Sequence, residues 1–291
     1  MKISLVCPVW NTPKSLFLAC LRSVVDLPGA TEENFEAIFV DDGATDSCPR
    51  VLDEFAENCP FMKVVHQENA GNGVARNVGV SLATGDYVVF LDCDDRLLPD
   101  FLENVLRTVT LGYDAYHFNF YKVREKDDPA LYPVFPHTWG DLRMPPDGQT
   151  WVYAWAKIIR REFLLEHNVH FPEAGVDIPR LHKGTYRNYV RGEDNYYCAL
   201  LLAEVPIARM VPWFGVVHVQ RKTSLGKSSV RDANVWADSV GLYLVYRALY
   251  DEGAKRGNDA LKDFSAEVMG LYWNMMDKGK CPKGWELPII E

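Results

Sequence analysis

The first 110 or so residues alternate short apolar runs with segments of helical periodicity, and this alternation constrains the fold more than any other feature. Short apolar runs are typical of buried strands, and longer amphipathic segments are typical of helices. Such βαβ repetition predicts an α/β fold with a mostly parallel sheet and helices on both faces. The predicted strands are residues 3–9, 35–40, 62–67 and 87–91, and the helices between them are residues 14–26, 48–58 and 74–83.

Beyond about residue 110 the pattern is less regular, and prolines interrupt any period between residues 124 and 150. We expect a catalytic domain over residues 1–230 and a helical extension over residues 231–291 that packs on it. The remaining predicted elements are a helix over 99–109, a strand over 114–123, a loop or short hairpin over 124–150, a helix and turn over 151–168, a helix over 193–203, short strands over 205–220 and helices over 233–277.

Three carboxylates, Asp92, Asp94 and Asp95, follow the fourth predicted strand, and we call them the acidic cluster. Ligands of parallel sheets bind beyond the carboxyl ends of the strands. Carboxylates this close together repel one another strongly unless a cation or a ligand compensates them. Oxygen ligands suit Mg²⁺ or Mn²⁺, which also bridge to phosphate oxygens. The cluster therefore predicts a divalent metal site in which one or two carboxylates bind the ion and another holds ribose hydroxyls.

Polar residues also follow the second and third predicted strands. Gly71 and Gly73 precede a helix whose free N–H groups can bind an anion, and Arg76 adds a positive charge in the first turns of that helix. This pattern suits a diphosphate, and a glycine loop with a surface arginine is the alternative. Asp42 ends the second strand, where its carboxylate can accept a hydrogen bond from a nucleotide base or can serve a turn and a helix cap.

Four segments in this order and spacing resemble the family 2 glycosyltransferases of GT-A fold: PVWN at 8–11, VDDGATD at 40–46, NAGNGVARNVG at 69–79 and ATGDYVVFLDCDD at 83–95. A weaker similarity continues through WAKIIRREFLLEHNVHF at 155–171 to an acidic pair, Glu193 and Asp194. The resemblance implies a GT-A fold, which is a Rossmann-like, mixed and mostly parallel sheet flanked by helices. It also implies an inverting, metal-dependent enzyme that transfers a sugar from a nucleotide-diphosphate donor.

The resemblance assigns roles around the donor nucleotide. In similar enzymes the residue at Asp42 contacts the uracil or other base, and Pro8 with its neighbours as far as Asn11 forms the wall beside it. Asp92 and Asp94, with Asp95 next to them, would hold the ribose and the metal ion on the diphosphate. The division between Asp94 and Asp95 as the main metal ligand is open.

The resemblance also assigns the later residues. Asp194 of the acidic pair is the expected general base, although either Glu193 or Asp194 can fill that role. An acceptor hydroxyl is a poor nucleophile near neutral pH without such a base. His218 is a candidate third metal ligand and Arg221 a candidate diphosphate contact, each with a structural role as the alternative.

The predicted reaction is a single addition to a glycan or lipid-linked acceptor in cell-surface polysaccharide synthesis, with a UDP-sugar as the expected donor. The segment around Gln220 lacks the QxxRW pattern of processive synthases. The alternatives are a nucleotide-sugar-binding module without turnover and, less favoured, a sugar nucleotidyltransferase, which needs a basic glycine-rich loop that is absent near the first strand.

The composition of the chain limits which classes of partner it can bind and which cellular location is expected. A formal net charge of -9 argues against nucleic acid as a partner, because binding a phosphate backbone requires a broad basic surface. The first residues do not resemble a signal peptide and no apolar run is long enough to cross a bilayer, which predicts a cytoplasmic protein, with peripheral contact at the inner face of the membrane as a variant. The C-terminal helices can dock on the catalytic domain, pair in a homodimer or lie on a membrane, and their mixed charges favour docking.

Overall fold

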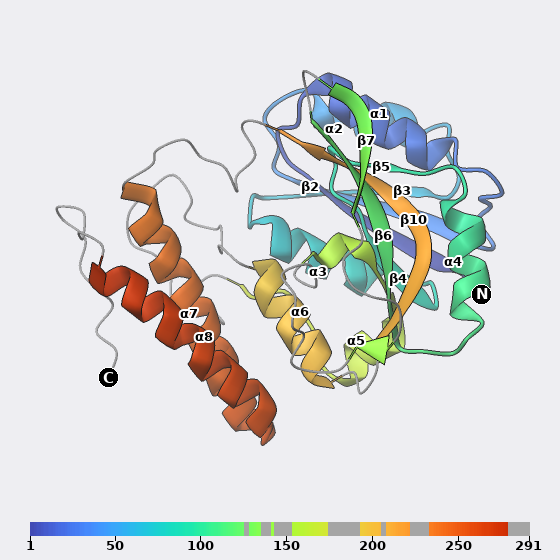
Figure 1. Ribbon diagram of the computed structural model, residues 1–291. Helices are drawn as coiled ribbons and strands as arrows, with labels where there is room; N and C mark the ends of the chain where they lie inside the picture. The colour runs from blue at the N-terminus through green and yellow to red at the C-terminus, as the bar shows by residue number, and fades with distance from the viewer. Residues whose placement is uncertain are drawn as a thin grey trace.

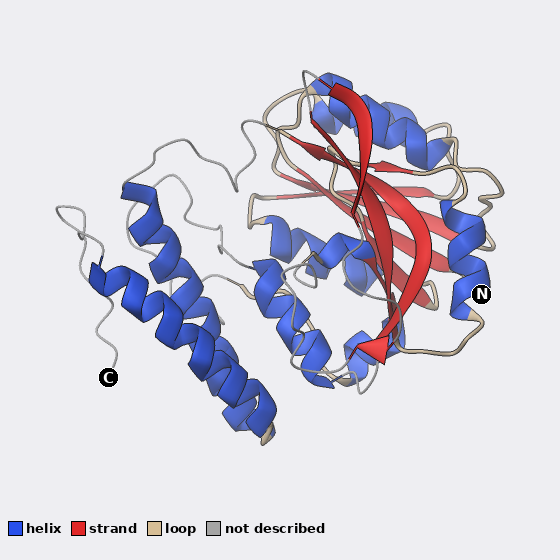
Figure 2. Cartoon of the chain, in the orientation of Figure 1, coloured by secondary structure: helices blue, strands red, loops and turns tan. Residues whose placement is uncertain are grey.

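The computed structural model describes residues 1–124, 128–134, 141–142, 153–173, 193–204, 208–221 and 233–278. Within these residues a curved mixed sheet lies between helices (Figures 1 and 2). The strands are β1 (Ile3–Val9), β2 (Phe35–Asp42), β3 (Met62–Gln67), β4 (Tyr87–Phe90), β5 (Arg96–Leu97), β6 (Ala115–Arg124), β7 (Asp128–Val134), β8 (Asp141–Leu142), β9 (Lys157–Arg160) and β10 (Ala208–Gln220). The helices are α1 (Lys14–Val25), α2 (Cys48–Ala56), α3 (Asn72–Leu82), α4 (Phe101–Val109), η1 (Ala154–Ala156, a 3₁₀ turn), α5 (Arg161–Glu166), α6 (Glu193–Glu204), α7 (Ala233–Arg256) and α8 (Asp259–Lys278).

The strand directions bring several strand ends to one side of the sheet, whose order is β3-β2-β1-β4-β9-β6-β10-β5. β1 pairs in parallel with β2 and β4, and β2 pairs in parallel with β3. β9 is antiparallel to both β4 and β6, so β6 and its parallel neighbour β10 run in the same direction as the first four strands. The carboxyl ends of β1, β2, β4 and β10 therefore share one edge, which we call the carboxyl edge. The predicted mixed sheet flanked by helices is confirmed.

The structure differs from the sequence prediction between residues 153 and 168, where a helix and turn were expected. The turn η1 leads instead into strand β9, and only then does the short helix α5 begin. Ile158 and Ile159 are fully buried where β9 pairs with β4 and β6. Two β-branched residues fit this slot, because such side chains pack well on a pleated surface. A second difference is that β10 is a single long strand with irregular register between Met210 and Val216 rather than several short strands.

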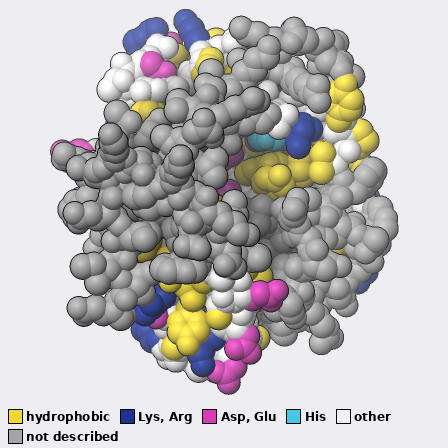
Figure 3. Space-filling view, turned by 60° about the vertical axis from the view of Figure 1, so that its left-hand side comes forward, with side chains coloured by type: hydrophobic (Ala, Val, Ile, Leu, Met, Phe, Trp, Pro, Cys, Tyr) yellow, Lys and Arg dark blue, Asp and Glu magenta, His cyan; other side chains and the backbone are white. Residues whose placement is uncertain are grey.

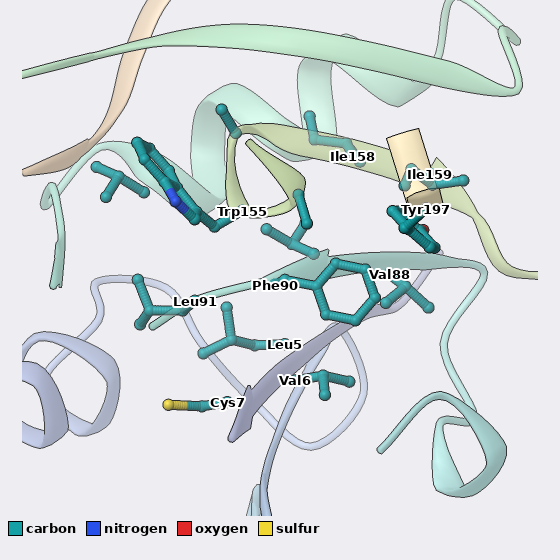
Figure 4. Packing of buried hydrophobic residues seen from close by; sticks show 14 of the residues in the cluster. Leu5, Val6, Cys7, Val88, Phe90, Leu91, Trp155, Ile158, Ile159 and Tyr197 are labelled. Carbon is teal, nitrogen blue, oxygen red and sulfur yellow. The ribbon is translucent and has the colours of Figure 1, made fainter. Parts of the chain in front are cut away.

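The core positions the site by close packing of α3 on β1. Figure 4 shows Phe90 of β4 among residues of β1 and β9, with Tyr197 of α6 nearby. The rings of Phe90 and Tyr197 lie 5.6 Å apart in an edge-to-face arrangement. A Cβ atom on Gly79 of α3 would lie 2.2 Å from Cγ1 of Val6, so a larger residue cannot occupy this position without displacing the helix. The helix that carries Arg76 is therefore held directly against the sheet.

The two C-terminal helices, α7 and α8, lie side by side and contact α6 (Figure 1). Arg256 at the end of α7 donates hydrogen bonds to the carboxylate of Glu204 at 3.0 Å and to the backbone carbonyl of His167 at 2.7 Å. The predicted domain boundary at residue 230 lies outside the described residues, so the division into 1–230 and 231–291 stays a prediction. In the part of the chain that the structure describes, no helix has the length and apolar character needed to span a bilayer.

A buried carboxylate on β2, Glu36, ties three segments of the sheet together. Its side chain is 1% exposed and accepts hydrogen bonds from Lys63 Nζ at 2.7 Å, Ser4 Oγ at 2.6 Å and the Thr84 backbone N–H at 2.6 Å. Burial alone would raise the pKa of Glu36, but the hydrogen bonds from Lys63, Ser4 and Thr84 outweigh it and lower the pKa to about 2. A folded-state pKa below the unfolded value stabilises the fold at every pH above the unfolded value.

We expect Glu36→Gln to lower the free energy of unfolding at pH 7 by about 3 kcal/mol, since the pKa falls from 4.5 to about 2 on folding. The difference between wild type and variant should shrink as the pH falls from about 4.5 to about 2, where Glu36 becomes protonated in both states. Urea unfolding at several pH values measures this. Glu54→Gln, which removes an exposed ion pair with Arg50, is the control and should change stability by less than about 1 kcal/mol at any pH. An equal loss at pH 7 and pH 3 would rule out the ionic explanation.

Candidate active site

The acidic cluster begins directly after β4, at the carboxyl edge. The backbone N–H of Asp95 donates to the carbonyl of Asp92 at 2.9 Å, which turns the chain sharply and brings the three carboxylates together. One oxygen from each of Asp92, Asp94 and Asp95 lies within 4.8 Å of the others. Figure 3 shows acidic side chains within a hollow on this face of the molecule, with a histidine and a basic side chain above a group of hydrophobic ones.

A buried guanidinium joins the acidic cluster to the acidic pair on α6. Arg76 is 1% exposed, and it donates from Nη2 to Asp92 at 2.7 Å and from Nη1 to Asp194 at 2.8 Å. Its Cζ atom lies 5.0 Å from the centre of the Phe171 ring, and that ring is stacked on Tyr197. Burial would lower the pKa of Arg76, but the charges of Asp194 and Asp92 outweigh it and raise the pKa. Arg76 therefore has two carboxylate partners in this structure, and its contact with a diphosphate stays a prediction.

The third carboxylate of the cluster binds the end of β10. Asp95 is fully buried, and its Oδ1 accepts the backbone N–H of Val219 at 2.8 Å. Its Oδ2 lies 3.0 Å from Nδ1 of His218, whose ring stacks on Trp155 at 5.1 Å between centroids. Burial would lower the pKa of His218, but the charge and hydrogen bond of Asp95 outweigh it and raise the pKa. Asp95 thus fixes the orientation of the His218 ring.

Asp94 forms an ion pair with the residue that follows β10. Nε of Arg221 lies 2.7 Å from Oδ2 of Asp94. Burial and the charges of Asp95 and Asp92 raise the pKa of Asp94 to about 7, although Arg221 acts against this rise. The pKa of Asp94 therefore stays raised even though its carboxylate is paired with Arg221.

The acidic pair lies at the N-terminus of α6. Burial and the charge of Asp194 raise the pKa of Glu193 to about 8. Burial also raises the pKa of Asp194, and Arg76 opposes this rise. The backbone N–H of Ala154 in η1 donates a further hydrogen bond to the Asp194 carboxylate. The two carboxylates thus differ: Asp194 is ion-paired with Arg76, whereas Glu193 is mostly neutral at pH 7.

Asp42 is engaged by the loop between β3 and α3. Its Oδ1 accepts from Gln67 Nε2 and from the Ala70 N–H, both at 2.8 Å. Its Oδ2 accepts from the Gly71 N–H at 2.9 Å and from Asn69 Nδ2 at 3.1 Å. A carboxylate offers about four lone pairs, so these hydrogen bonds occupy the acceptor positions that a base N–H would need. Gly71 has a φ of 100°, a left-handed conformation that favours glycine and starts α3.

The predicted wall beside the base follows β1. Pro8 is buried in β1 opposite Val40 of β2. Asn11 is exposed with a φ of 36°, and its Oδ1 accepts the backbone N–H of Thr45 at 2.8 Å. The loops after β1 and β2 are thereby held together at the carboxyl edge. Trp10, which lies between Pro8 and Asn11 in the sequence, has an exposed ring.

Most predicted site residues therefore meet in three pairings that connect distant parts of the chain: Asp92 and Asp194 through Arg76, Asp94 with Arg221, and Asp95 with His218. Asp42, Gly71, Pro8 and Asn11 form a separate group of loop contacts. Lys157, whose charge acts on Asp194, is not among the predicted residues. A lysine inside the otherwise apolar run AWAKII is the sequence signal that marks it.

A family model described as Glycosyl transferase family 2 matches residues 4–166, more than half of the chain. The putative glycosyltransferase EpsH of Bacillus subtilis is 32% identical over 179 residues, covering 60% of this chain and 51% of EpsH. The uncharacterized glycosyltransferase YibD of Escherichia coli is 29% identical over 188 residues, covering 58% of this chain and 52% of YibD. The chain thus spans about half the length of these curated relatives.

Solved structures show the same fold at low sequence identity. S. aureus TarS 1–349 in complex with UDP-GlcNAc superposes with a TM-score of 0.69 at 18% identity, over 94% of this chain and 72% of that one. The mannosyltransferase PcManGT from Pyrobaculum calidifontis, in complex with GDP-Man and Mn²⁺, gives a TM-score of 0.56 at 16% identity, over 97% of this chain and 76% of that one. With the matched family model and the four motifs at the carboxyl edge, the chain belongs to glycosyl transferase family 2.

Proposed function

We propose that this protein is an inverting, metal-dependent transferase that moves a sugar from a nucleotide-diphosphate donor to an acceptor hydroxyl. The observation that carries the proposal is the bridge at the carboxyl edge, where Arg76 joins Asp92 of the acidic cluster to Asp194 on α6. Arg76 thus lies between the carboxylate that we assign to the cation site and the carboxylate that we assign as the base. Direct transfer requires that the donor and the acceptor bind side by side, so the donor site and the base must lie close together.

The donor set fits a divalent cation. Three carboxylates contribute oxygens within 4.8 Å of one another, which is a hard-ligand set suited to Mg²⁺ or Mn²⁺. We assign Asp94 as the main ligand, because Asp95 is fully buried and bonded to His218 and Val219. His218 keeps Nε2 as its candidate ligand atom, with the ring oriented by Asp95 in the manner of carboxylate-histidine pairs at metal sites. The bound ion would offset negative charge on the leaving diphosphate.

Asp194 is the proposed general base. It accepts the proton of the acceptor hydroxyl while that oxygen bonds to the anomeric carbon from the face opposite the diphosphate. The bond between the anomeric carbon and the diphosphate oxygen breaks, and the configuration inverts. Arg76 opposes the rise that burial causes in the pKa of Asp194, and we assign Arg221 as the residue that contacts the departing diphosphate.

The donor and acceptor follow from weaker observations. A UDP-sugar of the hexose or N-acetylhexosamine type is our proposed donor, since TarS, which shares the fold, was solved with UDP-GlcNAc. The loop group of Asp42, Gly71, Pro8 and Asn11 is the proposed base pocket, with Asp42 acting through the loop that it holds. The proposed acceptor is a glycan or lipid-linked glycan in cell-surface polysaccharide synthesis, and the proposed location is the cytoplasm, including the inner face of the membrane. Pairing in a homodimer through α7 and α8 is an additional proposal.

The experiment that tests the proposed function is UDP release from a panel of UDP-sugars with Mn²⁺ and with EDTA. Wild type should release UDP from at least one donor only when metal is present. Asp94→Ala should lose this activity by about a thousandfold, because an electrostatic contact in the transition state contributes about that much. Glu103→Ala, on the exposed side of α4, is the matched control and should keep full activity.

Three results would contradict parts of this proposal. Full activity in EDTA would rule out the proposed role of the metal ion. Retained configuration at the anomeric carbon would rule out Asp194 as the base of an in-line displacement. Binding of UDP with metal but no release from any donor in the presence of acceptors would favour a binding module.

A further inference from the structure

Lys157 has a basic side chain in the interior of the protein, and the proposed reaction leaves its role unexplained. It is the first residue of β9, and its side chain is fully buried. Removing an ammonium group from water costs several kcal/mol, so such a group is retained only where partners compensate it. The partners of Lys157 therefore indicate what its charge does.

Those partners lie on the two segments that hold Asp194. Nζ of Lys157 donates a hydrogen bond to the backbone carbonyl of Tyr153, and it also forms a hydrogen bond with the thiol of Cys198. Burial lowers the pKa of Lys157, whereas the hydrogen bond with Cys198 and the charge of Asp194 act in the opposite direction. The ammonium thus interacts with both η1 and α6.

The contact with Tyr153 closes the turn that contains Ala154. The N–H of Ala154 donates to the Asp194 carboxylate, so this turn is a direct support of that side chain. The contact with Cys198 acts from the other side, because Cys198 follows Asp194 by four residues on α6 and lies on the same face of the helix. Lys157 therefore links the helix that carries Asp194 to the turn that hydrogen-bonds it.

Charged groups on α3, on β9, on α6 and after β4 act on the acidic pair. Arg76 on α3 and Lys157 on β9 are the positive groups, whereas Glu193 on α6 and Asp92 after β4 are the negative ones. Without Lys157, only Arg76 would remain among these groups to compensate three carboxylates. A guanidinium that is already shared with Asp92 would then compensate Asp194, together with the hydrogen bond from the Ala154 N–H.

We propose that Lys157 is a positioning residue for Asp194: its ammonium group locks the η1 turn against α6 and supplies the second positive charge beside the carboxylate. This role rests on the proposed function only for its catalytic consequence. The electrostatic link between Lys157 and Asp194 holds whether or not the enzyme is a transferase.

The first test is therefore independent of activity. Lys157→Met keeps the length of the side chain and removes its charge, and the Asp194 carboxyl carbon can be followed by NMR with ¹³C-labelled aspartate, assigned by comparison with Asp194→Asn. Loss of the positive charge should raise the pKa of Asp194 by about one unit. Cys198→Ala removes the contact of Lys157 with α6 but keeps the ammonium group, so it should raise that pKa by less than Lys157→Met does. An unchanged pKa in a folded Lys157→Met protein would overturn the proposal.

The second test uses the reaction. Lys157→Met should lower kcat by about ten- to a hundredfold, the cost of a misplaced catalytic group, with KM for the donor and affinity for UDP unchanged. The acid limb of its pH-rate profile should move upward together with the pKa of Asp194. Equal losses in kcat for Lys157→Met and Cys198→Ala, without movement of the acid limb, would reduce Lys157 to a packing role. If wild type transfers no sugar, the proposed function fails while the NMR result still decides the link.

Discussion

Asp194→Asn should lower kcat by about a hundred- to ten-thousandfold, the range that a positioned general base contributes. Asparagine keeps the shape and can still accept the hydrogen bond from Nη1 of Arg76, which is 2.8 Å from the aspartate oxygen. It cannot accept the proton of the acceptor hydroxyl. The variant should therefore fold normally and bind UDP with metal as wild type does, and single-turnover transfer measured with donor and acceptor should show the loss.

Glu193→Gln is the matched control for Asp194→Asn. The pKa of Glu193 is raised to about 8, so this side chain is mostly protonated at pH 7 and glutamine resembles its neutral form. Its kcat at pH 7 should fall by less than about tenfold, with a larger difference from wild type above pH 8, where glutamate becomes charged. A larger loss in Glu193→Gln than in Asp194→Asn at pH 7 would transfer the role of base to Glu193.

Arg76→Met should lower the free energy of unfolding by about 3 to 5 kcal/mol, the usual cost of removing one partner from a buried ionic group. The guanidinium is 1% exposed and hydrogen-bonded to Asp92 and Asp194, so its loss leaves both carboxylates without their main countercharge. Urea unfolding at pH 7 measures the effect. Arg22→Met on the exposed side of α1 is the control and should change stability by less than about 0.5 kcal/mol.

Arg76→Lys separates charge from geometry. A lysine supplies one point charge and cannot bond two carboxylates through a planar fork, so part of the stability should return without full activity. Metal added to Arg76→Met should also restore part of the stability if the cation binds Asp92. A loss below about 1 kcal/mol in Arg76→Met would show that the carboxylates find other partners, and would remove the bridge as a stabilising element.

The first half of the sheet was predictable because its signals are local. β1 matches residues 3–9, and α3 begins two residues earlier than the periodicity indicated, at the left-handed Gly71. Strand β9 was not predictable in this way, because Ile158 and Ile159 become a strand only through burial between β4 and β6, which are far apart in the sequence.

The site shows the same division between local and distant information. The acidic cluster could be placed at a strand end from the motif alone, and the structure brings its oxygens together there. The partners of each carboxylate could not be predicted from the motif, because Arg76 and Asp194 are 118 residues apart and meet only in the folded chain. The same holds for Asp42, whose motif indicated a base contact but whose oxygens bond to side chains and N–H groups of the next loop.

The three pairings of the acidic cluster bear on how such chains can be recombined. The matched family segment ends at residue 166, whereas the groups that pair with the cluster or share its buried cation lie at Asp194, His218 and Arg221. A chimera that joins this first segment to the later part of a relative would inherit buried carboxylates without their matching groups. Exchange of the later part between family members would thus require that the residues at those three positions match the carboxylates of the first segment.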